Sequence, residues 1–193
     1  MIKRFVASLY LSNRFFIVLG VLGVLFLCTY FFATLFVLVK TIFNIMVLLV
    51  IVDFVLLYGF RNAMNARRSA AEKLSNGDYN PFTIYLGNGY PFPVYVKVYD
   101  ELPMQFQMRD HYFEKELNAR SESQIHYQLK PLKRGNYNFG ALNVYVHTLL
   151  GLVVRRYRLD NDLNLPVYPS FIQMRKYEFL AIHNRLQMAG IKK

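Results

Sequence analysis

The sequence predicts two membrane helices in an antiparallel hairpin, then an all-β, immunoglobulin-like antiparallel sandwich and a short C-terminal helix. Three patterns lead to this prediction: two apolar runs within residues 15–60, period-2 alternation across residues 81–170, and helical spacing across residues 171–193. The 193 residues are 54% hydrophobic yet carry a net charge of +11, so two unlike regions are averaged in the totals. This apolar content excludes a disordered chain, and a single Cys excludes a disulfide framework or a Cys-based zinc finger.

The hairpin is predicted from two consecutive apolar runs. No charge occurs from Phe15 to Val39, and Asp53 is the only charge from Thr41 to Phe60. Because a span needs about 20 apolar residues, each run suffices. A signal peptide is disfavoured, since the first run is too long, lacks an Ala-x-Ala-like site and is followed by the second. One span with an interfacial segment is the alternative, and the tip of the hairpin is left open between Ala33–Thr34 and Lys40–Thr41.

The basic residues that flank the hairpin predict its orientation. Lys40 is the only basic residue between the runs, whereas basic residues cluster before and after them: Lys3, Arg4, Arg14, Arg61, Arg67, Arg68 and Lys73. The positive-inside rule therefore places both termini, including residues 1–14, and the sandwich in the cytoplasm.

Asp53 is an acid within the second predicted helix, where a carboxylate is costly and is by default a functional candidate. We favour a structural or assembly role, in which it bonds Asn44, Thr41 or another subunit, over a proton relay, because the hairpin supplies no second acid. Homo-oligomerisation through the hairpin is left open.

The remaining 133 residues change character after Phe60. Residues 61–80 are predicted as a juxtamembrane helix and linker, helix-compatible over 62–74 and ending in the turn Ser75–Asp78. Six strand segments follow within 81–170, with one or two weak strands between Leu102 and Leu117; the six begin at Phe82, Val94, Ser123, Tyr137, Leu152 and Asn164. Residues 171–193 are predicted as an amphipathic helix with Ser170 as its N-cap.

No catalytic or metal-binding pattern is present. The four His residues lack metal-ligand spacing, and adjacent strand positions point Asp100 and Glu101 to opposite faces. We found no nucleophile elbow, Walker loop or zinc-protease motif, so the protein is predicted not to be an enzyme and to need no cofactor. Residues after Phe60 hold 19 Lys and Arg against 11 Asp and Glu. Because these basic residues are scattered outside any nucleic-acid module, we predict no nucleic acid as partner and assign the charge to a membrane or protein surface.

The second half contains a group of motif residues: Leu129, Pro131, Arg134, Gly135, Tyr137, Phe139, Gly140, Gly151, Leu152, Val167, Tyr168 and Pro169. An E-K-L-S-N-G-D segment at 72–78, an N-x-Y-P-F-P-V segment at 88–94 and the two apolar runs precede them. Together these features resemble the bacterial domain-of-unknown-function 58 family, most closely its members from Bacteroidetes. The resemblance implies a multi-pass protein of the bacterial inner membrane that works with a MoxR-type AAA+ ATPase.

Two departures from the family pattern are visible. Thr148-Leu149 replaces the family's Ser-Pro, and the Trp-containing signature that follows in the family is missing, so the chain is expected to be the N-terminal half of such a protein. A subunit of a transport or secretion-related membrane complex is the alternative function, and an enzyme with its site in the missing half is a third.

The motif residues also have a physical interpretation of their own. Arg134-Gly135 is a turn in which Gly takes positive φ, and Arg134 is assigned a turn-stabilising role ahead of partner binding. Tyr137 and Phe139 share a core-facing side of one strand, and Gly140 indicates a bulge or a close backbone approach.

Overall fold

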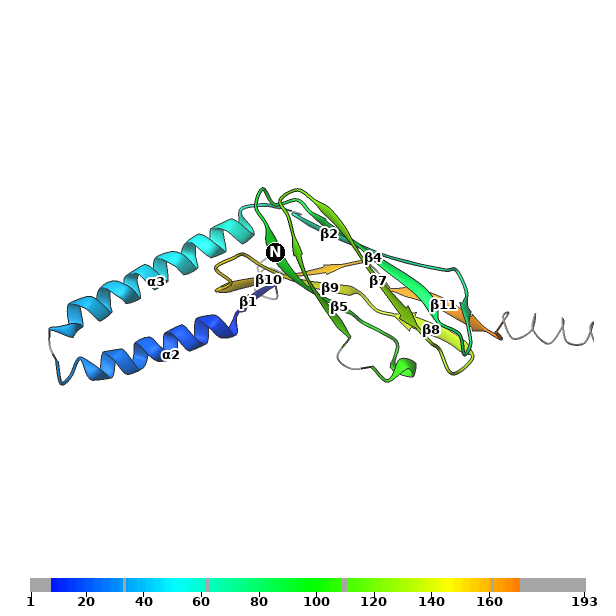
Figure 1. Cartoon of the computed structure of the whole chain (residues 1–193), viewed down its shortest axis with the longest axis horizontal. Helices are drawn as coiled ribbons and strands as arrows, with labels where there is room; N and C mark the ends of the chain where they lie inside the picture. The colour runs from blue at the N-terminus through cyan, green and yellow to red at the C-terminus, as the bar shows by residue number, and fades with distance from the viewer. Residues whose placement is uncertain (1–7, 33, 62, 109–110, 161, 171–193) are drawn as a thin grey trace, which may run out of the picture.

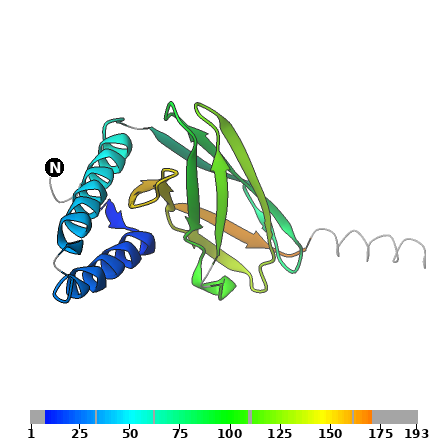
Figure 2. The ribbon, with the colours of Figure 1, turned by 60° about the vertical axis from the view of Figure 1, so that its left-hand side comes forward.

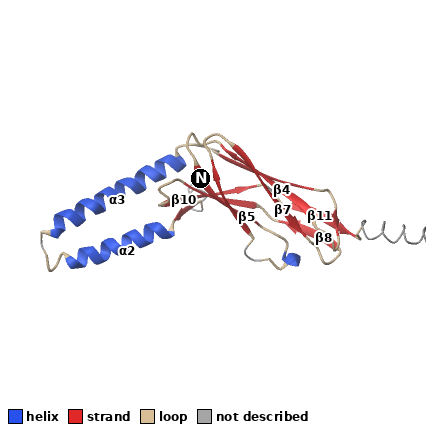
Figure 3. Ribbon diagram, in the orientation of Figure 1, coloured by secondary structure: helices blue, strands red, loops and turns tan. Residues whose placement is uncertain are grey.

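The computed structural model describes residues 8–32, 34–61, 63–108, 111–160 and 162–170. Two apolar helices project together from one end of an elongated β-sandwich (Figure 1). These are α2 (Asn13–Cys28) and α3 (Leu35–Tyr58), and Figure 3 shows strands joined by loops and turns in the rest of the described chain, with one short helical turn. The predicted C-terminal helix at 171–193 and the N-terminal residues 1–7 lie outside the described residues.

One helix is long and apolar enough to cross a membrane, and the other is shorter than the first predicted run. Among the described residues, α3 alone is long and apolar enough to cross a membrane, whereas α2 is apolar but has 16 residues. At 1.5 Å per residue, α2 is about 24 Å long. The first predicted run was too long because α2 ends at Cys28 and α3 begins at Leu35, which excludes Lys40–Thr41 as the tip. Lys40 consequently lies in the second turn of α3.

The juxtamembrane helix predicted for residues 62–74 was wrong. These residues form strand β2 (Met64–Ala70), and Leu74–Ser75 form the short β3. β2 pairs antiparallel with β4 (Asn80–Asn88) along its whole length and buries Met64 and Arg68. The four-residue spacing of these two side chains fits one face of a helix or of a strand, and the pairing with β4 selects the strand.

The sandwich consists of strands that share one core and pair antiparallel, except that the short β3 pairs parallel with β11. One sheet has the order β1-β10-β9-β5-β6, a second has β2-β4-β7, and β3-β11-β8 forms a third. The bounds not yet given are β1 Leu9–Leu11, β5 Val94–Asp100, β6 Tyr112–Leu117, β7 Glu122–Leu129, β8 Gly135–Phe139, β9 Leu142–His147, β10 Val153–Leu159 and β11 Leu163–Tyr168. Figure 2, which turns the molecule by 60°, shows the layers more nearly from the side.

A long two-stranded ribbon joins the two ends of the sandwich. β8 and β9 follow each other with a break at Gly140-Ala141, and their partners β11 and β10 return antiparallel to them. The segment predicted as one strand from Tyr137 is therefore two strands in different sheets. The region of Met104–Gln107 contains a short 3-10 helix (Met104–Phe106) in place of a weak strand, and β1 was not predicted.

Alternating side chains fill the core in the way the period-2 pattern predicts. Val94, Val96 and Val98 of β5 are buried, and Phe82, Ile84 and Leu86 of β4 face them across the sandwich. Leu57 of α3 belongs to the same core cluster and is fully buried. The end of α3 is thus part of the sandwich as well as part of the hairpin.

Candidate functional site: the junction between helix and sandwich

Asp53 lies at the contact between α3 and the turn that joins β9 to β10. Its side chain is fully buried, and one carboxylate oxygen accepts a hydrogen bond from the hydroxyl of Thr148. The other oxygen accepts the backbone N–H groups of Leu152 at 2.9 Å and Val153 at 2.8 Å. Both oxygens are therefore occupied by the sandwich, and the partners expected in the hairpin, Asn44 and Thr41, are not the ones used.

Leu152 connects both helices to the same point of the sandwich. Its N–H donates to Asp53, and its carbonyl oxygen accepts the N–H of Ser12 at 3.1 Å. Ser12 is the N-cap of α2 and its hydroxyl oxygen accepts the N–H of Phe15, which satisfies one of the free donors of the first turn. The start of α2 and the Asp53 turn of α3 consequently lie at one level, next to the β9–β10 turn.

The C-terminal end of α3 is satisfied by side chains of the sandwich. Arg155 donates from Nη1 to the carbonyl oxygens of Leu57 and Phe60, at 2.5 and 2.9 Å. A guanidinium at this position also opposes the partial negative charge that the helix dipole places at its C-terminus. The guanidinium carbon lies 4.6 Å from the ring centres of both Tyr58 and Tyr157, within cation–π distance.

A pair of tyrosines completes this end of the helix. Tyr90 donates its hydroxyl to the carbonyl oxygen of Leu57 at 2.9 Å, so it accepts from Tyr157, whose hydroxyl oxygen is 2.6 Å away. Burial raises the pKa of Tyr90 and the pKa of Tyr157, and for Tyr157 the hydrogen bond it donates to Tyr90 adds to the shift. Both phenols stay protonated in the physiological range, and the bond pattern is fixed.

We refer to Ser12, Asp53, Leu57, Tyr90, Thr148–Val153, Arg155 and Tyr157 together as the junction. Gly151 and Leu152, two of the motif residues quoted from the sequence, belong to it. Gly151 has φ +60°, and a Cβ atom there would lie 3.1 Å from a nitrogen of Arg14. The turn therefore requires glycine both for its conformation and for the close approach of Arg14.

Other motif residues meet at the opposite end of the sandwich. Val167 of β11 pairs with Leu74 of β3 on one side and with Gly135 of β8 on the other, so three quoted segments lie in one row. Pro131 accepts the N–H of Gly77 and Tyr168 accepts the N–H of Asn76, both at 2.8 Å. Pro169 follows Tyr168 at the same end. We call this region, residues 72–79, 130–135 and 167–170, the distal end.

Asp78 is held within the distal end by two hydroxyl donors. Ser75 and Ser170 both donate to its Oδ2 at 2.5 Å. These bonds, that from Ser170 first, lower the pKa of the Asp78 carboxyl below its ordinary value. The turn that the sequence predicts at Ser75–Asp78 is thus closed by side-chain bonds onto its own acid.

Between the two ends, the remaining motif residues serve the core. Tyr137 and Phe139 are buried on one face of β8, as the sequence predicts, and Tyr137 donates its hydroxyl to the carbonyl oxygen of Lys133 at 3.0 Å. Gly135 has φ +132°. Gly140 has no room for a side chain, because a Cβ atom would come within 2.8 Å of the Cβ of Glu101. The predicted close approach at Gly140 is confirmed.

Arg134 is exposed and forms no hydrogen bond or ion pair among the residues that the structure describes. The turn-stabilising role assigned to it therefore has no contact to support it within those residues.

A buried ion pair lies inside the sandwich and was not predicted. The side chains of Arg68 and Asp100 are fully inaccessible and form a salt bridge. Tyr127 donates its hydroxyl to the same carboxylate, and Arg68 donates to the carbonyl oxygen of Gly140 at 3.0 Å. Burial, with the Asp100 carboxylate beside it, raises the pKa of the Tyr127 hydroxyl. This group links β2, β5, β7 and the β8–β9 break, so its role is to join the two layers.

The described part of the chain holds no group of three His, Cys, Asp or Glu side chains placed to bind a metal ion. His126 bonds Thr83 and His147 bonds the carbonyl oxygen of Thr148, both on the sandwich surface. His111 differs, because it is partly buried against Phe113 and Tyr127, and this burial lowers its pKa below 6.5.

Sequence reasoning missed most of the junction. Thr148 appeared only as a departure from a Ser-Pro pair, although the hydroxyl that bonds Asp53 is the group which Thr and Ser share. Tyr90 and Arg155 gave no signal, because their partners are backbone carbonyls far away in the sequence. Asp53 did give a signal, since an isolated acid in an apolar helix requires partners.

Comparisons with known proteins found matches among solved structures only. No family model matches the chain, and no curated protein does. Among solved structures, a CARDB domain from Pyrococcus furiosus, crystallised with di-metal ions, is 12% identical over 54% of this chain and 87% of its own, with a TM-score of 0.37. An ASH/PapD-like domain of human CEP192 is 13% identical over 56% of this chain and 87% of its own, with a TM-score of 0.42. A β-glucosidase from Listeria innocua is 11% identical over 55% of this chain and 16% of its own, with a TM-score of 0.32.

Proposed function

We propose that this protein is a non-enzymatic, membrane-anchored β-sandwich that serves as an interaction module on the cytoplasmic face of a bacterial inner membrane. The junction is the observation that carries the proposal. It fixes the sandwich to both helices through Asp53, Leu152 and Ser12, so the sandwich is held at a defined height and orientation. A flexible tether would need none of these bonds.

Between the junction and the tip of the hairpin, the two helices have similar lengths. From Ser12 to the tip, α2 provides 16 residues, and from Val52 back to the tip, α3 provides 18 of its 24. At 1.5 Å per residue these are about 24 and 27 Å, close to the thickness of a thin bilayer core. In the remaining part of α3, Asp53 and Leu57 are buried against the sandwich. This matching supports a two-span hairpin in which Asp53 lies at the membrane surface.

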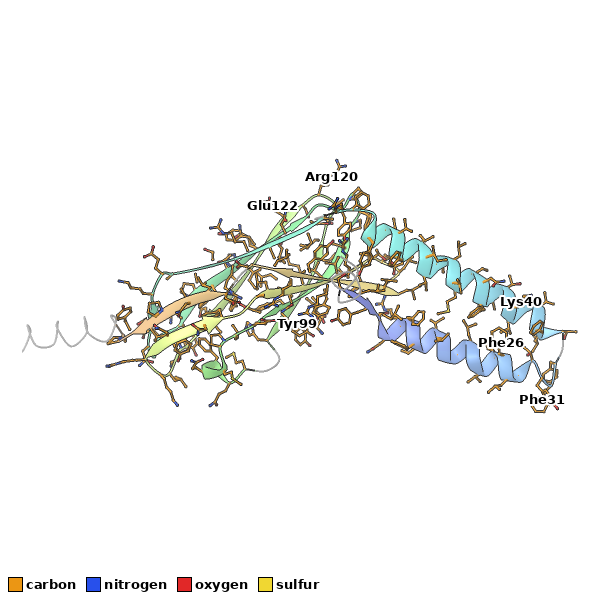
Figure 4. The ribbon with its side chains drawn as sticks, turned by 180° about the vertical axis from the view of Figure 1, so that it is seen from behind. Phe26, Phe31, Lys40, Tyr99, Arg120 and Glu122 are labelled. Atoms are coloured by element: carbon orange, nitrogen blue, oxygen red, sulfur yellow. The ribbon has the colours of Figure 1, made fainter. Side chains whose placement is uncertain are left out.

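The surface of the helices supports the same placement. Ile17, Leu27 and Val37 are each more than 60% exposed, although they are large apolar side chains. At the tip, Tyr30 and Phe31 are 88% and 78% exposed, as expected for aromatic residues at a membrane interface. Figure 4 shows Phe31 at the tip and Phe26 and Lys40 close to it. Lipid is the solvent that such a surface requires.

Selective cysteine labelling tests the membrane topology. In a Cys28→Ser background, a membrane-impermeant maleimide should label Tyr30→Cys in cells with a permeabilised outer membrane. Leu132→Cys, at the exposed distal end, should be labelled only after lysis. Labelling of Leu132→Cys in intact inner membranes would overturn the cytoplasmic placement, and failure to label Tyr30→Cys before lysis would overturn the two-span hairpin.

For the partner, we propose a MoxR-type AAA+ ATPase that docks at the distal end. The resemblance supplies the class of partner. The exposed Arg134, which has no ion pair among the described residues, and the exposed Leu132 supply a cation and an apolar side chain far from the membrane. Purified ATPase should bind nanodiscs that contain the full chain but not empty ones. Arg134→Glu should weaken this binding about tenfold, and Asn138→Glu, also exposed on β8, should leave it unchanged. Equal binding by both variants would exclude the distal end as the docking surface.

The alternative of a transport subunit loses its main support. It required Asp53 to face a pore, whereas both carboxylate oxygens are bonded within one chain.

A further inference from the structure

A groove of about 830 Å³ lies on the outer face of the sheet that contains β1, β10, β9, β5 and β6. Five tyrosines occupy this face: Tyr10, Tyr95, Tyr99, Tyr112 and Tyr145. Four of them form a continuous ladder across the strands, with ring centres 5.6 Å apart for Tyr10–Tyr145, 5.5 Å for Tyr145–Tyr99 and 5.4 Å for Tyr99–Tyr112. Figure 4 shows Tyr99 on the side of the sandwich from which α2 leaves.

The strand register orders the groove from the junction outward. In the row next to the junction, Tyr95 lies between His147 of β9 and Glu116 of β6. The next row places Lys97 between Tyr145 and Glu114. The groove therefore begins at the level where both helices meet the sandwich, and it continues away from the helices.

Two opposite charges in this groove have no counter-charge among the residues that the structure describes. Lys97 is paired with Glu114 at 3.0 Å, and Lys115 donates to the carbonyl oxygen of Gln124. Among the described residues, Arg14 and Glu116 line the groove without an ion pair. Within the described part of the chain, the groove thus presents one cation and one carboxylate that are not ion-paired.

Arg14 occupies the end of the groove that is nearest to the hairpin. It belongs to the first turn of α2, where the helix dipole places partial positive charge and a cation is unfavourable. The position of Arg14 is therefore not stabilised by its own helix. Arg14 and His147 approach each other over Gly151. The position that a Cβ atom would take on Gly151 lies 3.1 Å from a guanidinium nitrogen of Arg14 and 3.4 Å from Nδ1 of His147. Glu116 is two strands away from His147, about 10 Å between backbones, with the Tyr95 ring between them.

We propose that this groove binds the headgroup of an aminophospholipid from the adjoining leaflet. Arg14 binds the phosphodiester, which lies at the membrane surface. The ammonium group extends along the groove, over the face of Tyr95, to the carboxylate of Glu116. The order of the charges, cation next to the hairpin and anion farther along, matches a headgroup whose phosphate is nearer to the acyl chains than its amine. This inference depends on the membrane placement proposed above.

The test measures which lipid stays bound to the full-length protein. Protein in detergent is mixed with equal amounts of phosphatidylethanolamine and phosphatidylglycerol, and retained lipid is counted by native mass spectrometry. We expect phosphatidylethanolamine to be retained about tenfold more, and Arg14→Gln and Glu116→Gln each to lower its retention about fivefold to tenfold. The control variants Arg120→Gln and Glu122→Gln make the same charge changes on the opposite side of the sandwich (Figure 4) and should behave like the wild type.

Three results would overturn the proposal: equal retention of the two lipids, retention that neither Arg14→Gln nor Glu116→Gln alters, or a basic or proline-rich peptide that occupies the groove and excludes lipid. The cysteine labelling separates this inference from the proposed function. If labelling confirms the hairpin while lipid selectivity is absent, the groove assignment alone is wrong. If Tyr30→Cys is not labelled before lysis, the hairpin that the groove assignment requires is wrong as well.

Discussion

Replacing Asp53 by alanine removes the acceptor for three donors of the β9–β10 turn and should loosen that turn from α3. The amides of Leu152 and Val153 each lose a bond to a carboxylate, and the hydroxyl of Thr148 loses its acceptor. A hydrogen bond to a charged group contributes about 1.5–3 kcal/mol, and part of this is offset because the carboxylate no longer has to be buried. We expect a net loss of about 3 kcal/mol, localised to the junction.

Hydrogen exchange of the segment 148–156 measures this loss directly. Since 1.4 kcal/mol corresponds to a factor of ten, Asp53→Ala should speed exchange of the Leu152 and Val153 amides about a hundredfold. Asp53→Asn keeps one oxygen for both amides and turns its NH₂ toward the Thr148 hydroxyl, so about 1 kcal/mol and a fivefold change are expected. Thr148→Val is the matched control, because it leaves the carboxylate facing both amides.

Two outcomes would refute this account. Unchanged exchange of the segment in Asp53→Ala would mean that the carboxylate does not hold the turn. An effect of Asp53→Asn as large as that of Asp53→Ala would mean that charge, and not the arrangement of acceptors, is the relevant property.

Three further predictions concern the sandwich. Asp100→Ala leaves the Arg68 guanidinium buried without a counter-charge and should cost about 3–5 kcal/mol in urea unfolding of the detergent-solubilised protein, whereas an unchanged midpoint would contradict the ion pair's role. Gly140→Ala forces a Cβ atom against Glu101 and should cost about 1–3 kcal/mol in the same assay, while Gly20→Ala, which meets no atom within 4 Å, should cost far less. Because burial lowers the pKa of His111, this side chain binds a proton more readily in the unfolded state than in the folded state. The free energy of unfolding should therefore begin to fall as pH drops through about 6.5. His111→Gln should abolish this dependence, measured as the unfolding midpoint against pH.

The strands were predictable where one face is buried and the other is exposed to solvent. β5 is the clearest case, since its three buried valines alternate with Tyr95, Lys97 and Tyr99, and its predicted and observed bounds agree. β2 was not predictable, because its residues Asn-Ala-Arg-Arg-Ser-Ala are compatible with either a helix or a strand. The pairing with β4 selects the strand. β1 is three residues long and exists only because β10 lies beside it.

The only sign of the junction in the sequence is the energetic cost of placing the Asp53 carboxylate in an apolar helix. An isolated carboxylate in an apolar helix shows that partners exist, and it does not show where they are. The donors to Asp53 are 95 to 100 residues away, and two of them are backbone amides that every residue carries. Periodicity and motif spacing describe local structure, so contacts of this length fall outside their reach. Similarly, Arg68 and Asp100 are 32 residues apart, and each resembles an ordinary surface charge in the sequence.

The two clusters of motif residues are the two ends of one structural unit. The distal turn at Arg134-Gly135 leads into β8, β8 leads into β9, and β9 ends at Thr148, which bonds Asp53. The return strands β10 and β11 are hydrogen-bonded to these along most of their length, and β10 carries Arg155, which caps α3. A load applied at the distal end therefore runs along paired strands, where many backbone hydrogen bonds share it, and arrives at the Asp53 and Arg155 contacts. Since those contacts fix both helices at one level, the hairpin and the ribbon should move as one body.

Arg155→Ala should then weaken the junction without altering the distal end. Hydrogen exchange should therefore rise in residues 55–60 and stay unchanged in residues 131–137. Faster exchange at both ends would show that the ribbon is held by the sandwich core as a whole and that the junction is not a separate unit.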